Sequence, residues 1–395
     1  MILDNANDDD IFFYPKEDIE GGMQASNVAK RPLEVFLPQT PNGSILVTSR
    51  NSTAAMNLVG TDDNIIRVEP MDNKDALELL KSRVPFGKSS ESDAEALVQA
   101  LEGIPLAIAY AAAYIRIREP RETISTYLQL FRKSAANQNL LSSEDARDHQ
   151  PDHSIPHAII TTWQISFNQI QKTRPAAADL LALISMFDRQ GIPEYLLYDN
   201  SNQLQFNDMI ALLISFMLVR AQIGQQLFEM HSLVQLLMRK WLEQSKQIEK
   251  WRKESLRIMA GAFPSGEYET WTDCQVLLPH SKEVMTYVLN DKDGVLNWAK
   301  IADHTAWYLY LQGEYVVAEE ISRGAVERRE KVLGPEHLDT LASVFKLGLV
   351  LGSQGKYKES EAMHQRALEG REKVLGPEHP DTLTSRSNFA SMLWR

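Results

Sequence analysis

Short apolar runs without alternating polar positions characterise the first 70 residues of the chain. They lie at residues 1–3 (MIL), 44–48 (SILVT) and 65–68 (IIRV). Such runs are typical of parallel strands that are covered on both faces, so we expect an α/β fold over residues 1–70. The first run has only three apolar residues before Asp4, whereas strands usually have about five or six residues. The first strand therefore begins abruptly.

From residue 71 onwards the apolar positions follow a helical period. Asp72 or Asn73 can cap a first helix that contains residues 76–83. Further helical patterns follow until the polar, aperiodic stretch 134–153, which predicts a domain boundary. We therefore expect a helical domain over residues 71–150.

Residues 151–245 contain two helical patterns, then a short β pattern and a further helix. The polar turn 222–226 separates a helix at 207–218 from the apolar run 227–230. Helices that flank a small hairpin predict a winged-helix-like domain. The helix at 207–218 carries no Lys or Arg, and a recognition helix without cations could not position itself on phosphates. Nucleic acid is therefore not an expected partner.

The C-terminal part of the chain repeats itself. The segment REKVLGPEH occurs at residues 329–337 and again at 371–379, an offset of 42 residues. The same offset relates Gly313 to Gly355, which we expect to form tight turns within helix pairs. Agreement at one spacing over many positions predicts a solenoid of helix pairs over residues 296–395.

The segment between the predicted winged helix and the repeats, residues 246–295, is expected to be a helical linker. Its pattern predicts breaks at residues 264–266 (PSG) and at Pro279. Proline lacks a backbone N–H and clashes with the preceding turn of a helix.

Composition and charge narrow the class of protein. The 395 residues are 44% hydrophobic and 24% charged with a net charge of −12, values that fit a soluble globular protein without a nucleic-acid-binding surface. The single cysteine, Cys274, cannot form an internal disulfide and favours a reducing compartment. The apolar runs are too short to span a bilayer. We expect a cytoplasmic protein with no membrane partner.

The predicted solenoid resembles tetratricopeptide repeats of the kinesin-light-chain type, which also have a 42-residue period. The resemblance covers two full repeats and the first helix of a third, and it implies a groove that binds a protein or peptide. His304, Lys346 and Asn388 are equivalent at the repeat offset and are candidates for contacts with a peptide in that groove. The alternative is that they are ordinary solvated positions.

Two segments near the N-terminus resemble parts of NB-ARC or STAND-type ATPases, the class that includes plant and fungal immune receptors. Residues 2–6 (ILDNA) resemble the end of a Walker B strand, and residues 45–51 (ILVTSRN) resemble the sensor strand. The resemblance implies that Asp4 holds the hydration shell of Mg²⁺ and that Arg50 reads the γ-phosphate of ATP. The alternatives are an acidic tail and a solvated arginine.

Two further segments follow in the order expected of the same family. Residues 103–107 (GIPLA) resemble its GLPLA segment, and residues 230–235 (MHSLVQ) resemble its MHD segment. The resemblance implies that Pro105 packs near the adenine and ribose, and that His231 contacts the β-phosphate of ADP and latches the closed state. Ser232 replaces the aspartate of the plant pattern, which leaves the electrostatics of this latch open. A proline at a helix start and a structural histidine are the alternatives.

The loop that would grip the phosphates is missing from the sequence. A P-loop needs Gly-x-x-x-x-Gly-Lys-Ser/Thr after a strand, and at the only Gly-Lys-Ser, residues 87–89, Ser82 stands in the place of the first glycine. Asn5 occupies the place of a second acidic residue and cannot act as a base. We expect an N-terminally truncated ATPase with no catalytic residues, which binds ADP, ATP and Mg²⁺ weakly or not at all.

Together these patterns predict a multidomain chain, part α/β and part all-α. It would comprise a partial P-loop NTPase sheet, a helical ARC-like domain, a winged helix and a tetratricopeptide solenoid. The leading interpretation is a fragment of a nucleotide-switched, innate-immunity-like signalling protein that opens to form homo-oligomers. It requires Asp4, Arg50, Pro105 and His231 to converge on one cavity shaped for ADP. The alternatives are a repeat scaffold without nucleotide function and an active ATPase that begins upstream of Met1.

Overall fold

The computed structural model describes residues 2–3, 44–49, 52–59, 64–66, 68–84, 91–144, 157–198, 202–222, 224 and 226–393. The chain divides into two compact units, Met1–Pro70 and Met71–Arg395.

The first unit contains a small parallel sheet. Strand β1 (Ile2–Leu3) pairs with β2 (Leu46–Val47), with Ile2 opposite Leu46, and helix α2 (Ser52–Val59) follows. The expected parallel strands are thus present, although each is shorter than its apolar run. The expected third strand at 65–68 is wrong for the described residues 65, 66 and 68, which are not in a strand. Ile66 and Val68 are 87% and 94% exposed, so no strand of the described residues covers them.

The second unit begins with four helices. They are α3 (Asn73–Arg83), α4 (Glu91–Ala100), α5 (Pro105–Arg118) and α6 (Ile124–Glu144). Asp72 caps α3 as expected, since its carboxylate accepts a hydrogen bond of 2.8 Å from the backbone N–H of Asp75. Every residue from 107 to 115 of α5 is buried, so this helix lies at the centre of the group. Helix α6 continues to Glu144, and the polar stretch expected to mark a boundary therefore begins inside a helix.

A second group combines helices with a small sheet. Its helices are α7 (His157–Thr173), α8 (Pro175–Ile184), the 3₁₀ helix η3 (Glu194–Leu196), α9 (Gln203–Ser215) and α10 (Ser232–Gln244). Strands β3 (Ile192–Pro193), β4 (Val219–Ala221) and β5 (Leu227–Met230) form an antiparallel sheet in the order β3-β5-β4. The predicted order of helices, short β pattern and final helix is confirmed for this helix–sheet module.

Two helices connect this module to the repeats. Helix α11 (Ile248–Ala262) ends before the predicted break at 264–266, and a 3₁₀ helix, η4 (Tyr268–Thr270), leads into α12 (Trp271–Met285). The predicted break at Pro279 is wrong, because α12 continues through it. Residues on both sides of the proline, such as Leu277 and Val284, are fully buried, and this packing holds the helix together.

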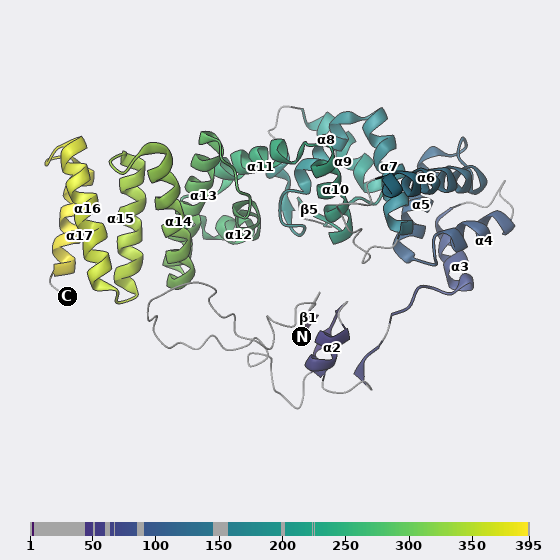
Figure 1. Ribbon diagram of the computed structural model, residues 1–395, viewed down its shortest axis with the longest axis horizontal. Helices are drawn as coiled ribbons and strands as arrows, with labels where there is room; N and C mark the ends of the chain where they lie inside the picture. Colours follow the sequence, from purple (N-terminus) through teal and green to yellow (C-terminus); the bar gives the residue numbers. More distant parts are fainter. Residues whose placement is uncertain are drawn as a thin grey trace. The chain divides into compact units, whose positions relative to one another are not determined.

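The repeats form helices α13 (Lys292–Leu311), α14 (Tyr315–Leu333), α15 (Leu338–Ser353), α16 (Tyr357–Leu375) and α17 (Pro380–Leu393). They lie side by side in chain order (Figure 1), and each packs against the next. Gly313 and Gly355 make the expected tight turns with φ of +85° and +78°. Gly334 ends α14 with φ of +92°, and His337 then caps α15 through its Nδ1. The predicted solenoid of helix pairs is confirmed.

A continuous apolar core runs through the second unit from Ala76 to Val350. A smaller cluster, which includes Val326, Leu347 and Ala367, fills the space between α14, α15 and α16. Within the described ranges, no helix is both long enough and apolar enough to cross a membrane.

Candidate functional site

Pro105 follows a strained glycine turn. Gly103 has φ of +62°, and a Cβ atom there would lie 2.4 Å from the carbonyl oxygen of Met71. The backbone N–H of Met71 in turn donates a hydrogen bond of 2.9 Å to the Gly103 carbonyl. Only glycine fits this conformation and close approach. Pro105 then occupies the first position of α5, where its missing N–H costs nothing, and its side chain is exposed.

His231 caps helix α10. Its Nδ1 accepts a hydrogen bond of 3.2 Å from the backbone N–H of Leu233, so this nitrogen carries no proton and the neutral ring carries its proton on Nε2. Partial burial lowers the pKa of His231, and the cationic side chains of Arg220 and Arg189 lower it further. The neutral Nε2–H is therefore a donor in a cationic environment, which suits a phosphate oxygen.

The helix that carries Pro105, α5, packs against the helix–sheet module that contains His231. The ring of Tyr114 on α5 lies 6.2 Å from the ring of Phe216, which ends α9. The charge of Arg220 on β4 affects a residue of each part. It lowers the pKa of His231. Burial raises the pKa of the Tyr110 hydroxyl on α5, and Arg220 partly offsets this rise. Arg220 therefore lies within electrostatic reach of both α5 and the cap of α10.

Of the four residues expected to converge, the structure describes Pro105 and His231. Asp4 and Arg50 lie outside the described residues, as do residues 87–89. Two cavities of the second unit are each about 470–490 Å³, and neither is lined by Pro105 or His231. In the described part, no group of three or more His, Cys, Asp or Glu side chains could hold a metal ion. A phosphate oxygen accepts hydrogen bonds from donors such as the Nε2–H of His231, but the sequence lacks the glycine-rich loop that would hold the other phosphates of a nucleotide.

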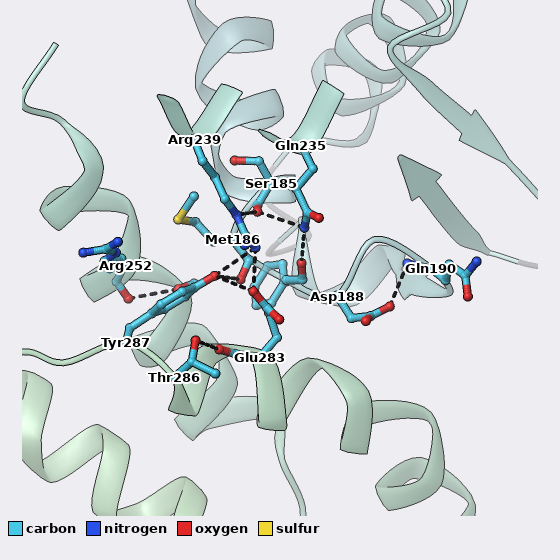
Figure 2. Close-up of polar contacts among 12 residues, drawn as sticks. Ser185, Met186, Asp188, Gln190, Gln235, Arg239, Arg252, Glu283, Thr286 and Tyr287 are labelled. Atoms are coloured by element: carbon cyan, nitrogen blue, oxygen red, sulfur yellow. Dashed lines mark hydrogen bonds and ion pairs between the residues drawn. The ribbon is translucent and has the colours of Figure 1, made fainter. Parts of the chain in front are cut away.

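A polar junction joins α10 to both α8 and α12 (Figure 2). Arg239 Nε donates a hydrogen bond of 2.7 Å to the Ser185 carbonyl, and Gln235 Nε2 donates one of 2.8 Å to the Phe187 carbonyl. The Tyr287 hydroxyl donates a hydrogen bond of 2.6 Å to the Met186 carbonyl. These side chains satisfy carbonyls that follow the C-terminal end of α8, which a helix cannot satisfy by itself.

Buried arginines join successive helix pairs of the solenoid. Arg329 forms an ion pair with Asp303 and donates a hydrogen bond of 2.6 Å to the Ser343 hydroxyl. Its equivalent, Arg371, donates one of 2.8 Å to the Ser385 hydroxyl. Phe345 stands at the position of Asp303 in this second pair, and the Arg371 guanidinium lies 5.0 Å from the centre of its ring. An ion pair and a cation–π contact thus occupy the same place in successive repeats.

Comparison with known proteins supports the assignment of the repeats. The model of the tetratricopeptide repeat family matches residues 306–373 and 341–395. Over 351 residues, 87% of this chain, the sequence is 34% identical to a nucleotide-binding leucine-rich repeat (NLR)-like protein of Hyaloscypha variabilis. The chain is therefore NLR-like and has a tetratricopeptide repeat region. It spans 34% of the length of that relative.

The three groove candidates of the NLR-like chain are half-buried, and each has a contact within the chain. His304 Nδ1 lies 3.2 Å from the Phe263 carbonyl, and Asn388 Nδ2 donates a hydrogen bond of 3.0 Å to the Thr384 carbonyl. Lys346 Nζ lies 5.9 Å from the centre of the Trp307 ring. Burial lowers the pKa of Lys346, which the nearby Asp303 carboxylate partly offsets. Their role in peptide binding stays a prediction.

Sequence reasoning missed the polar junction and the buried arginines. Gln235 and Arg239 lie four and eight residues after His231 on one face of α10, and this spacing could have drawn attention to them. Arg329 and Arg371 begin the repeated segment REKVLGPEH itself. The repeat pattern of the NLR-like chain marks these two arginines, but it does not indicate that they are buried or which residues they contact.

Proposed function

We propose that this NLR-like chain is the regulatory part of a nucleotide-switched signalling protein whose tetratricopeptide repeats bind a protein partner. The observation that carries the proposal is the state of His231, a helix cap whose Nδ1 accepts the bond from Leu233 and whose pKa is lowered by burial and by the charges of Arg220 and Arg189. ADP, when bound, supplies the diphosphate that the Nε2–H of this histidine can hold. The helix–sheet module would be a winged helix, and the protein would act in the cytoplasm.

The residues of this chain have distinct roles in the proposal. His231 would donate Nε2–H to a β-phosphate oxygen while its Nδ1 keeps α10 capped, and Arg220 would stabilise the negative charge. Pro105 offers an exposed apolar ring for the adenine and ribose. Without a glycine-rich loop these contacts give weak binding, so we propose that the chain has no ATPase activity of its own. Opening of the intact switch would allow homo-oligomers to form.

The phosphate contact can be tested with histidines that serve as matched controls. His337 and His379 cap α15 and α17 through the same 3.2 Å contact to Nδ1 as His231. In a ¹⁵N NMR experiment on the full chain, millimolar ADP with Mg²⁺ should shift the Nε2 resonance of His231 and leave those of His337 and His379 unchanged. Equal shifts at all three, or none, would contradict the proposed contact. A micromolar dissociation constant by calorimetry would contradict weak binding.

Protein binding by the repeats is supported by the family match and needs its own test. Affinity capture with the full chain should identify a partner whose binding is lost in Lys346→Glu, because this half-buried lysine lies beside Trp307. Lys358→Glu, on α16, is the matched charge reversal at an exposed site and should retain the partner. A partner that Lys346→Glu still captures in full does not use this part of the solenoid.

A further inference from the structure

The second unit contains a cavity that the proposed nucleotide contact does not use. It has a volume of about 470 Å³ and lies between α10, α11 and α12. This volume is within the range of roughly 300–1,000 Å³ that is usual for small-molecule sites. Its apolar lining includes Leu236, Ile248 and Val288, and its polar lining includes the Tyr287 side chain. A mixed lining of this kind suits an organic molecule with one charged end.

The charges around the cavity favour an anion. Three cationic side chains, Arg239, Lys240 and Arg252, line it together with two carboxylates, Glu243 and Glu283. Glu283 is already neutralised by Arg239, with 2.8 Å between Oε1 and Nη2. Glu243 is 56% exposed and forms a longer ion pair, of 3.8 Å, with Arg252. With three cations and two carboxylates, the lining as a whole carries one net positive charge.

Arg252 gives the most specific evidence for a ligand in this cavity. Its Nε is buried and has no hydrogen-bond partner among the described residues, which is an unfavourable state for a charged donor. Its guanidinium lies 5.5 Å from the centre of the Tyr287 ring, and Figure 2 shows the two side chains next to each other. An acceptor in the cavity would satisfy this donor.

The start of α11 adds backbone donors at the same place. The helix begins at Ile248, which lines the cavity, and its N-cap residue Gln247 makes no side-chain capping bond. The first N–H groups of a helix have no partner within it and carry partial positive charge. Phosphate groups bind at such ends when a cationic side chain lies close by.

We propose that this cavity binds a small phosphate ester. The phosphate would accept hydrogen bonds from Arg252 and the first N–H groups of α11, with Lys240 as a further cation, and the organic part would contact Leu236 and Val288. Arg239 is engaged with Ser185 and Glu283 and would keep that role. The site lies at the C-terminal half of α10, whereas His231 caps its N-terminal end, so the two phosphate contacts are separate.

Calorimetry on the full chain with phenyl phosphate, inorganic phosphate and ADP tests this proposal. Phenyl phosphate should bind more tightly than inorganic phosphate because it also fills the apolar part of the cavity. Arg252→Gln should weaken phenyl phosphate binding at least tenfold, and Glu243→Gln should strengthen it two- to threefold by removing a like charge. Lys250→Gln is the matched control, since Lys250 lies over Trp251 on the same helix but not on the cavity.

The outcomes separate this site from the nucleotide contact. ADP binding that His231→Ala abolishes and Arg252→Gln retains belongs to the proposed switch and not to the cavity. Absence of phenyl phosphate binding at millimolar concentration, or equal binding by Glu243→Gln and the original chain, would overturn the proposal. If Arg252→Gln fails to fold, as near-UV circular dichroism would show, the Glu243→Gln comparison still decides.

Discussion

Arg239 on α10 forms an ion pair with Glu283 on α12, with 2.8 Å between Nη2 of the arginine and Oε1 of the glutamate. The same guanidinium bonds the Ser185 carbonyl and the Tyr287 hydroxyl. One side chain thus connects the end of α8, the helix capped by His231 and the helix that precedes the repeats. Through these contacts, a displacement of α10 would also move α12, just before the solenoid.

Replacement of Arg239 by alanine should lower the free energy of unfolding by about 2–3 kcal/mol, because the hydrogen bonds of its guanidinium to the Ser185 carbonyl and the Tyr287 hydroxyl and its ion pair with Glu283 are lost. Urea unfolding monitored by circular dichroism measures this change. Arg257→Ala removes a similar ion pair, with Glu254 at 2.6 Å, from a more exposed site and should leave stability almost unchanged. Equal losses in the two variants would show that the junction has no special role.

The glycine turn before Pro105 gives a second prediction with an internal control. Gly103→Ala should destabilise the second unit by about 2 kcal/mol or more, because a Cβ atom meets the Met71 carbonyl at 2.4 Å in addition to the strain of a positive φ. Gly191 has almost the same φ, +63°, but nothing lies within 4 Å of its Cβ position. Gly191→Ala should therefore show only the smaller cost of backbone strain, about 1 kcal/mol. Thermal unfolding of the two variants gives the comparison.

The buried ion pair in the repeats gives a third prediction. Asp303→Ala should cost about 3 kcal/mol or more, since it leaves the Arg329 guanidinium buried without its carboxylate. The second repeat has Phe345 at this position. Asp303→Phe, which introduces the arrangement of that repeat, should therefore recover part of the loss. Urea unfolding of both variants tests whether Asp303→Phe is more stable than Asp303→Ala. If Asp303→Phe is the less stable variant, the two arrangements are not interchangeable.

The sequence predicted the solenoid well because its turns are made by local chemistry. Gly334 and Gly376 have φ of +92° and +89°, and His337 and His379 cap the helices that follow. These residues recur at one offset, so the sequence pattern was enough to predict the helix pairs and their turns. The junction of Arg239 with Glu283 joins residues far apart in the chain, and no periodicity indicates which helices will pack together.

At particular residues, tertiary packing overrides the secondary structure that the local sequence predicts. Pro279 predicts a break, yet α12 passes through it between the buried side chains of Leu277 and Val284. The apolar residues at 65–68 predict a strand, but a strand forms only against a partner, and no strand of the described residues pairs with Ile66 or Val68. For the candidate site, order along the chain pointed to Pro105 and His231, whereas the electrostatic effect of Arg220 on His231 became visible only in the fold.

Buried histidines should make the protein less stable in weak acid. His280 and His364 are each 1% exposed, and burial lowers the pKa of both; for His280, the Gly191 carbonyl and Asp188 partly offset this effect. In the unfolded chain a histidine takes up a proton near pH 6.5. Below that pH the unfolded state therefore binds more protons than the folded state, and stability falls as pH decreases towards the folded pKa values.

The loss should be evident between about pH 6.5 and 5, above the range in which carboxylates titrate. His280→Gln can keep the 3.1 Å hydrogen bond to the Gly191 carbonyl without taking up a proton, so it should flatten the dependence of urea stability on pH. His157→Gln, at an exposed position, is the matched control and should leave the slope unchanged. If His280→Gln retains the full slope, the acid sensitivity does not come from this histidine, and His364→Gln is the variant that would then have to remove it.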